Sequence, residues 1–203
     1  SRPDLYCLEG LPIAIQLANT KEKESLIPSW FIEEKRFNKM NQLEAAFYFA
    51  RELPFLRPER LFRREAPAPI NLMDAIYASF HVLVPEKAPP MPKGREGEIK
   101  KLIQHIKHFF AAATIESLKQ PATRFVSTGF ENSVKRWIAA NHKTSIRAAT
   151  LITGDLKHTI AWVLAEQDNV TGMLARDRVS EVMRFVLSKE YYELRERLGL
   201  AIS

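Results

Sequence analysis

The sequence has little of what most disulfide, metal and membrane proteins are built from. A single cysteine, Cys7, among 203 residues excludes an intramolecular disulfide and a cysteine-rich zinc site, and it fits a reducing compartment. No apolar run approaches the roughly 20 residues that span a bilayer. The first ten residues carry acidic side chains where a signal peptide needs an apolar core. We therefore expect a soluble, intracellular protein without a membrane partner, and the sequence does not distinguish cytoplasm from nucleus.

Sequence motifs of catalysis and of cofactor binding are also missing. The seven glycines form no dinucleotide-binding or phosphate-binding loop, and there is no GxSxG, HExxH or CxxC motif. His105 and His108 are three residues apart, a spacing that can direct two imidazoles at one metal ion, but no carboxylate or cysteine nearby completes a site. Cys7 has no neighbouring base. The sequence thus favours a protein that is not an enzyme, with no cofactor and no metal.

Positive charge is present in excess, and it is concentrated in the middle of the chain. Thirty Lys and Arg oppose 24 Asp and Glu, a net charge of +6. Residues 51–110 and 111–150 each carry a net +4, whereas residues 1–50 and 151–203 each carry −1. Excess charge gathered in one region attracts a polyanion better than the same charge scattered over the surface.

Apolar residues at helical spacing predict a mainly α protein with at most one or two short strands. Asn41 and Asp155 stand where N-caps of two helices are expected, and Asn71 where a third begins. The expected helices cover residues 29–37, 42–53, 72–83, 98–118, 133–140, 155–167 and 176–198, with a strand at 11–17. Residues 145–152 fit either a strand or a helix.

Prolines and glycines suggest where the chain divides. Residues 84–97 hold four prolines and two glycines, a composition that resists regular structure. We therefore predict an N-terminal helical part at 1–83, an exposed connection at 84–97 that is a linker or a surface loop, and a C-terminal helical domain at 98–203. Replacing residues 88–93 by a flexible spacer is then expected to change stability little.

Two groups of cations are candidate binding residues. The first follows the helices of the central region and is interleaved with hydroxyl and amide side chains of the kind that contact phosphate and sugar. Its members are Lys100, Lys101, Lys107, Arg124, Lys135, Arg136, Lys143 and Arg147. They predict binding of DNA or RNA, with an acidic protein partner of an adaptor, inhibitor or regulatory subunit as the alternative. Trp137 shares its spacing with Val134 and Ile138, so we assign it to the core.

The second group lies among prolines and aromatic residues. It consists of Arg57, Arg60, Arg63 and Arg64. Arginine binds carboxylate and phosphate with two parallel hydrogen bonds, so this segment is a candidate contact for an anion or a partner protein. The alternative is that the arginines cover an apolar segment packed on the core.

The order of expected elements resembles the ribbon-helix-helix DNA-binding unit, in which paired strands enter the major groove. Residues 143–198 fit a strand, a helix, a turn and a helix, and residues 11–53 allow the same order. Two such halves would make a pseudo-dimer within one chain. The sequence departs from the family in that Gln16 is the only polar side chain of the first strand, and residues 168–175 are longer than the family's tight turn.

Overall fold

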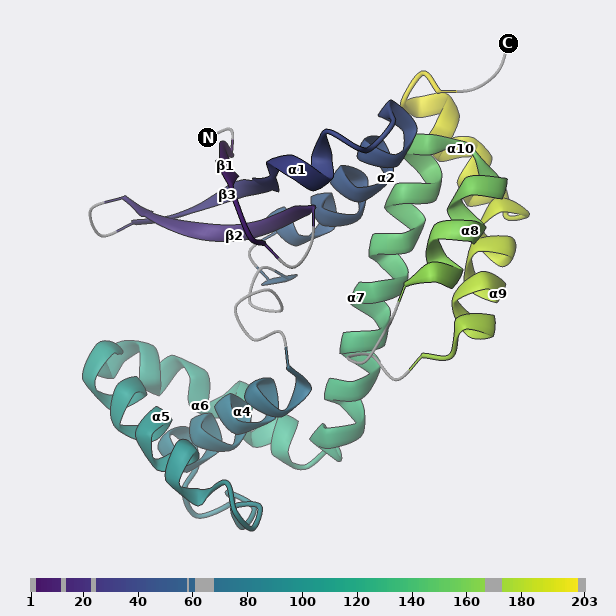
Figure 1. Cartoon of the computed structure of the whole chain (residues 1–203). Coiled ribbons are helices and arrows are strands. Elements are labelled where there is room, and N and C mark those ends of the chain that lie inside the picture. Colours follow the sequence, from purple (N-terminus) through teal and green to yellow (C-terminus); the bar gives the residue numbers. More distant parts are fainter. Residues whose placement is uncertain are drawn as a thin grey trace. The chain divides into compact units, whose positions relative to one another are not determined.

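The computed structural model describes residues 3–11, 14–22, 25–57, 59–60, 68–166 and 173–200. The protein is mainly helical, as predicted, with a small mixed sheet of three strands near the N-terminus (Figure 1). The strands are β1 (Asp4–Leu8), β2 (Ile15–Glu22) and β3 (Ser25–Glu33); the helices are α1 (Glu34–Phe37), α2 (Gln42–Glu52), the 3₁₀ helix η1 (Leu53–Leu56), α4 (Pro69–Leu83), α5 (Glu96–Phe109), α6 (Ala112–Val126), α7 (Phe130–Thr153), α8 (Leu156–Ala165), α9 (Ala175–Val186) and α10 (Lys189–Arg197).

The chain forms two compact units, and the boundary between them falls within α7. Unit 1 consists of residues 1–65 and 139–203, and unit 2 consists of residues 66–138. The segment 84–97, predicted to separate two parts, therefore lies inside unit 2. Its residues Ala88 and Met91 pack against the core of that unit. Arg95 adds an ion pair with the buried carboxylate of Asp74 in α4, which ties the end of the segment to that helix.

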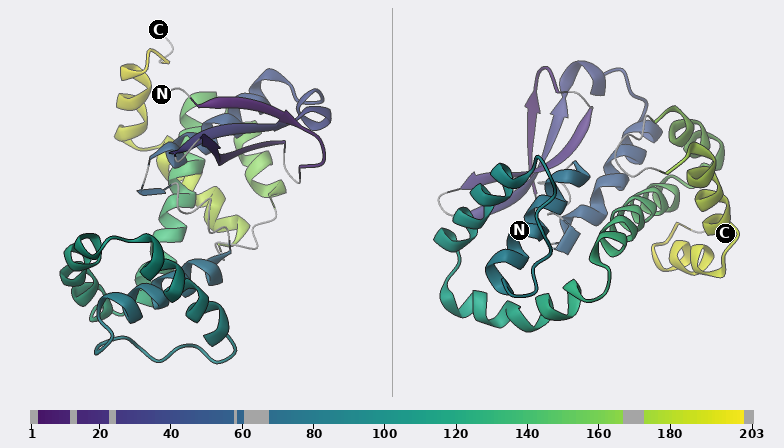
Figure 2. Two further views of the ribbon diagram at one scale, coloured as in Figure 1. Left: turned by 90° about the vertical axis from the view of Figure 1, so that its left-hand side faces the viewer. Right: turned by 90° about the horizontal axis from the view of Figure 1, so that it is seen from below.

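The sheet of unit 1 has the order β1-β3-β2 (Figure 2). β1 is parallel to β3, and β2 is antiparallel to it. The register places Ile15 opposite Ile32 and Leu17 opposite Trp30, so that buried apolar side chains meet across the strands. The helix predicted over residues 29–37 is wrong for most of its length. β-branched and aromatic side chains in this stretch suit a strand, and pairing with β2 decides the outcome.

Helix α2 joins the sheet to the helices of unit 1. Phe49 contacts Trp30 of β3, with ring centroids 5.1 Å apart. Phe47 faces the other way and packs on Trp162 of α8 at 4.8 Å, within a core that includes buried residues of α7 and α9. The predicted cap is confirmed, because the Asn41 side chain accepts a hydrogen bond from the Glu44 backbone N–H at 2.8 Å. Two differently directed apolar faces on one helix thus hold this unit together.

Unit 2 is built around α4, against which α5, α6 and the first residues of α7 pack. Its core is an aromatic cluster in which ring centroids lie between 4.9 and 6.2 Å apart. The members are Tyr77, Phe80, Phe125 and Phe130. Leu72 of α4 packs with Val134 and Ile138 of α7, and Trp137 lies against them as predicted.

Several helix boundaries differ from the prediction. The helix expected at 98–118 is two helices, because Phe110 is extended, and α6 then continues through Pro121 to Val126. The helix expected at 176–198 is also two, since the Ser188 hydroxyl accepts a hydrogen bond from the Tyr191 N–H and caps α10. α4 begins at Pro69, before the predicted cap Asn71, because proline is well suited to the first turn.

The ribbon-helix-helix order is not present. Residues 143–152, one of its expected strands, belong to helix α7. In the N-terminal half, β2 is followed by its antiparallel partner β3, where the motif requires a helix. The resemblance therefore does not extend to the fold.

The packing of Ala88 and Met91 leads to a stability prediction that differs from the one drawn from sequence. Replacing Ala88–Lys93 by Gly and Ser of equal length is expected to lower the free energy of unfolding by about 2 kcal/mol, because the apolar side chains no longer pack on the unit 2 core. For a protein of this size that corresponds to a melting temperature lower by roughly 4–8 °C. Changing the exposed Glu86 and Lys87 to serine is the control; equal melting temperatures for all three proteins would show that the segment is not packed.

Candidate functional site

The lysines of α5 lie on the side of the helix that faces away from the core. Ile99 is fully buried against the unit 2 core, whereas Lys100 and Lys107 are exposed. These two lysines are seven residues apart, about two helical turns, so they share one face. Lys101 is also exposed, but its Nζ is 2.9 Å from Glu98 Oε1, so part of its charge is offset locally.

Further cations of unit 2 lie on α6 and α7. Arg124, Lys135 and Arg136 are exposed, and Val134 and Ile138 anchor this part of α7 to α4. Within the part of the chain that the structure describes, none of these three cations has a carboxylate within 4 Å. Six of the eight predicted cations therefore belong to unit 2, where they are distributed over three helices.

Lys143 and Arg147 belong to unit 1 and have a different environment. Both contact the carboxylate of Glu181 in α9: Arg147 Nε donates to Oε1 at 2.7 Å, and Lys143 Nζ lies 3.3 Å from Oε2. The Glu181 side chain is only 3% exposed. A buried carboxylate requires compensating charge and hydrogen bonds, so these two cations stabilise the packing of α7 against α9.

The pKa of Glu181 reflects that balance. Burial alone raises the pKa of a carboxyl group, since it disfavours the charged form. Hydrogen bonds and positive charge from Arg147, and then from Lys143, outweigh burial and hold the pKa below its ordinary value of 4.5. Glu181 is thus ionised near neutral pH and keeps both cations engaged.

A cavity of about 310 Å³ adjoins Arg147 within unit 1. Leu151, Phe185 and Leu194 supply apolar walls, and Glu190 also lines the cavity. The guanidinium of Arg147 stacks over the Phe185 ring at 5.3 Å, and its Nη1 is 3.9 Å from Glu190 Oε2. With two carboxylates near the Arg147 and Lys143 charges, the cavity has no excess positive charge to attract an anion.

The second predicted group is described only in part. Arg57 is exposed and pairs with Glu59, Nε to Oε1 at 2.8 Å. Arg60 is partly buried, and its backbone N–H donates to the Arg57 carbonyl. Arg63 and Arg64 lie outside the described residues. The two alternatives for this group, anion contact and cover for an apolar segment, stay predictions.

Arg178 of α9 is a buried cation that the sequence analysis missed. It is 3% exposed, and its guanidinium donates to the carbonyls of Met173, Val163 and Glu166 at 2.9, 3.2 and 2.8 Å. These bonds fasten the end of α8 to α9. The spacing could have indicated that Arg178 is buried, because it lies one helical turn before the buried Val182. It was overlooked because arginine is ordinarily a surface residue.

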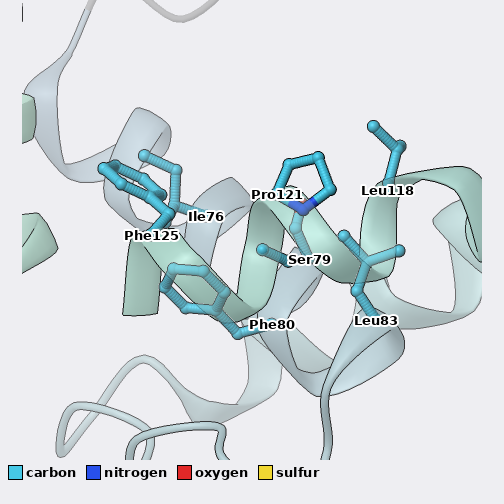
Figure 3. Close-up of a pocket in the computed structure, with 8 residues that line it drawn as sticks. Ile76, Ser79, Phe80, Leu83, Leu118, Pro121 and Phe125 are labelled. Carbon is cyan, nitrogen blue, oxygen red and sulfur yellow. The ribbon is translucent and has the colours of Figure 1, made fainter. Parts of the chain in front are cut away.

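An apolar groove lies between α4 and α6 in unit 2 (Figure 3). Its volume is about 280 Å³, and seven of its eight lining residues are apolar or proline. The lining consists of Ile76, Ser79, Phe80, Leu83, Leu118, Pro121, Ala122 and Phe125. No sequence motif marks this groove, because its lining residues on α4 and α6 are at least 35 positions apart in the sequence and come together only when the helices pack.

The candidate catalytic and metal-binding residues do not converge. Among the described residues, no three His, Cys, Asp or Glu side chains come together in a group that could hold a metal ion. The His105 and His108 rings both contact Phe109, and Cys7 is exposed on β1. No helix in the described ranges is both long enough and apolar enough to span a membrane.

Comparison of the chain with protein-family models, with curated proteins and with solved structures finds no match. Function is therefore inferred from the geometry and charge of the described residues.

The ion pairs of Glu181 lead to a pH-dependent stability prediction. A carboxyl whose folded pKa is below its ordinary 4.5 stabilises the fold above that pH, and this contribution is lost as the pH falls through the folded pKa. We expect Glu181→Gln to lower the unfolding free energy at pH 7 by about 2 kcal/mol, less than the ~3–5 kcal/mol for a fully buried pair because Lys143 and Arg147 are partly exposed.

Urea unfolding of the wild type and the variant from pH 7 to about pH 3 measures this difference, which should shrink below pH 4.5. Glu196→Gln, at an exposed position of α10, is the matched control and should have little effect at any pH. A Glu181→Gln effect that is the same at all pH values would contradict a role for the ionised carboxylate.

Proposed function

We propose that the protein is not an enzyme and that it binds nucleic acid, or associates with nucleoprotein, through the exposed cations of unit 2. The observation that carries this proposal is a group of exposed cations without a carboxylate within 4 Å among the described residues. The group consists of Lys100, Lys107, Arg124, Lys135 and Arg136.

The charge balance of the two units supports the proposal. Unit 2 holds ten Lys and Arg against six Asp and Glu, a net charge of +4, and unit 1 carries the remaining +2 over a longer sequence. In unit 1 several cations are engaged within the fold, among them Arg51 with Glu166, and Arg147 with Glu181. Exposed lysines and arginines without local partners are available to displace counterions from a phosphate backbone.

Contacts of this kind would position the protein on nucleic acid without reading its sequence. Side chains of α5 and α7 extend from helix faces whose opposite sides pack on α4, so the cations can contact phosphates without any change in the core. We therefore expect similar binding to mixed-sequence DNA and RNA, with strong dependence on salt.

An acidic protein partner is the second candidate, and one observation favours it specifically. The apolar groove between α4 and α6 offers a surface that phosphate contacts do not use. A protein partner can bury apolar side chains and pair acidic ones with the same unit.

The experiment that tests the first candidate is a salt titration. The wild type is expected to bind mixed-sequence single- and double-stranded oligonucleotides at low salt. Changing Lys100, Lys107, Lys135 and Arg136 together to glutamine should weaken binding, because fewer phosphates are then neutralised. The slope of log K against log salt should fall by roughly 0.7–0.9 for each phosphate that the variant no longer engages.

The matched control changes four exposed cations of unit 1 to glutamine: Lys157, Arg176, Arg184 and Lys189. Both variants carry four fewer positive charges than the wild type, so a difference between them reports location and not net charge. Absence of binding by the wild type at low salt, or equal slopes for the two variants, would reject the nucleic-acid proposal.

A further inference from the structure

The groove between α4 and α6 is elongated. In Figure 3, Ile76 and Phe125 lie at one end and Leu83 and Leu118 at the other. Each helix contributes a row that advances by seven residues, from 76 to 83 and from 118 to 125. At 1.5 Å per residue each row is about 10.5 Å long, or two helical turns. An amphipathic helix that presents apolar residues at positions i, i+3 or i+4, and i+7 covers the same length.

The chemistry of the lining favours a protein side chain over a polar small molecule. Ser79 is the only hydroxyl among the lining residues, and it already donates to the Ala75 carbonyl at 2.7 Å. Small-molecule sites combine apolar walls with several converging polar groups and usually exceed ~300 Å³. This groove has neither property, whereas its size and lining suit a few inserted Leu, Ile or Phe side chains. Leu118, 40% exposed, forms an accessible part of its wall.

The charges around the groove indicate the sign of the partner. On α6, Lys119 and Arg124 lie to either side of the apolar row, each roughly 110° around the helix from its centre. Glu116 pairs with Lys119, and Arg124 has no carboxylate partner among the described residues. Unit 2 as a whole carries +4. A second copy that presented its own unit 2 would bring the same positive charge to the groove and would be repelled.

We propose that the groove between α4 and α6 binds an acidic amphipathic helix of a partner protein. Apolar residues on one face of that helix insert between the rows of α4 and α6, and acidic residues beside them face Arg124. Arg124 belongs to both proposals, but the quadruple glutamine variant leaves it unchanged. The groove does not include Lys100, Lys107, Lys135 or Arg136, so the two proposals can be tested separately.

The test uses the full chain and three synthetic 18-residue peptides. Each has Leu, Ile or Phe at i, i+3, i+4 and i+7 and glutamate at most other positions. Three control peptides carry the same apolar residues with lysine in place of glutamate. Fluorescence anisotropy is expected to show that at least one acidic peptide binds at micromolar concentration and that its lysine counterpart binds about tenfold more weakly or not at all.

Two variants locate the binding. Leu118→Ser removes an apolar side chain from the wall of the groove and should weaken binding of the acidic peptide about tenfold. Arg124→Gln should weaken binding by a smaller factor, and this effect should disappear at high salt. Leu164→Ser, an exposed leucine of α8 in unit 1, is the matched control and should leave binding unchanged. Circular dichroism and melting temperature confirm that each variant is folded.

Each contrary result rejects the inference. The inference is rejected if no acidic peptide binds at roughly 0.1 mM, 100 times the expected micromolar range. It is also rejected if the lysine peptides bind equally well, or if Leu118→Ser and Leu164→Ser have equal effects. Sedimentation showing a dimer of the free chain that Leu118→Ser dissociates would assign the groove to self-association. The nucleic-acid titration of the quadruple glutamine variant is independent, so either proposal can fail alone.

Discussion

A buried carboxylate must be compensated by positive charge, and in this protein the buried carboxylate is that of Glu181, which packs against α7. Lys143 and Arg147 provide this charge, so two of the eight predicted cations form ion pairs with a buried residue of unit 1. Removing either cation would leave a buried negative charge undercompensated, and phosphate could engage them only by competing with Glu181. Lys143 and Arg147 are therefore engaged in the packing of α7 on α9.

The two units differ in where their charged side chains lie. Unit 1 uses buried charge to join its helices: Arg147 with Glu181, and Arg178 with the carbonyls at the end of α8. Unit 2 has an aromatic core that needs no such charge, with the Asp74–Arg95 pair as its buried ionic contact among the described residues. Its other cations extend into solvent. An apolar core with an outward cationic surface is the arrangement that an anionic partner can use.

Local pattern predicted the fold class and some caps, because apolar stripes and N-caps are properties of neighbouring residues. The Asn41 cap is an example. β3 was missed because its aromatic and β-branched residues become a strand only through pairing with β2. The partner of Lys143 and Arg147 was missed for a similar reason: Glu181 is more than 30 residues away, and no periodicity relates it to them. The sequence predicted the excess of positive charge. It could not predict which cations form ion pairs within the fold and which are exposed.

The central claim is that the cations of unit 2, and not those around Glu181, contact nucleic acid. Lysine acetylation, quantified by mass spectrometry with and without a mixed-sequence oligonucleotide at low salt, tests it residue by residue. The account predicts that the oligonucleotide protects Lys100, Lys107 and Lys135, with Lys143 and the exposed Lys157 of unit 1 unchanged. Protection of Lys143 without protection of the unit 2 lysines, or no protection anywhere, would contradict it.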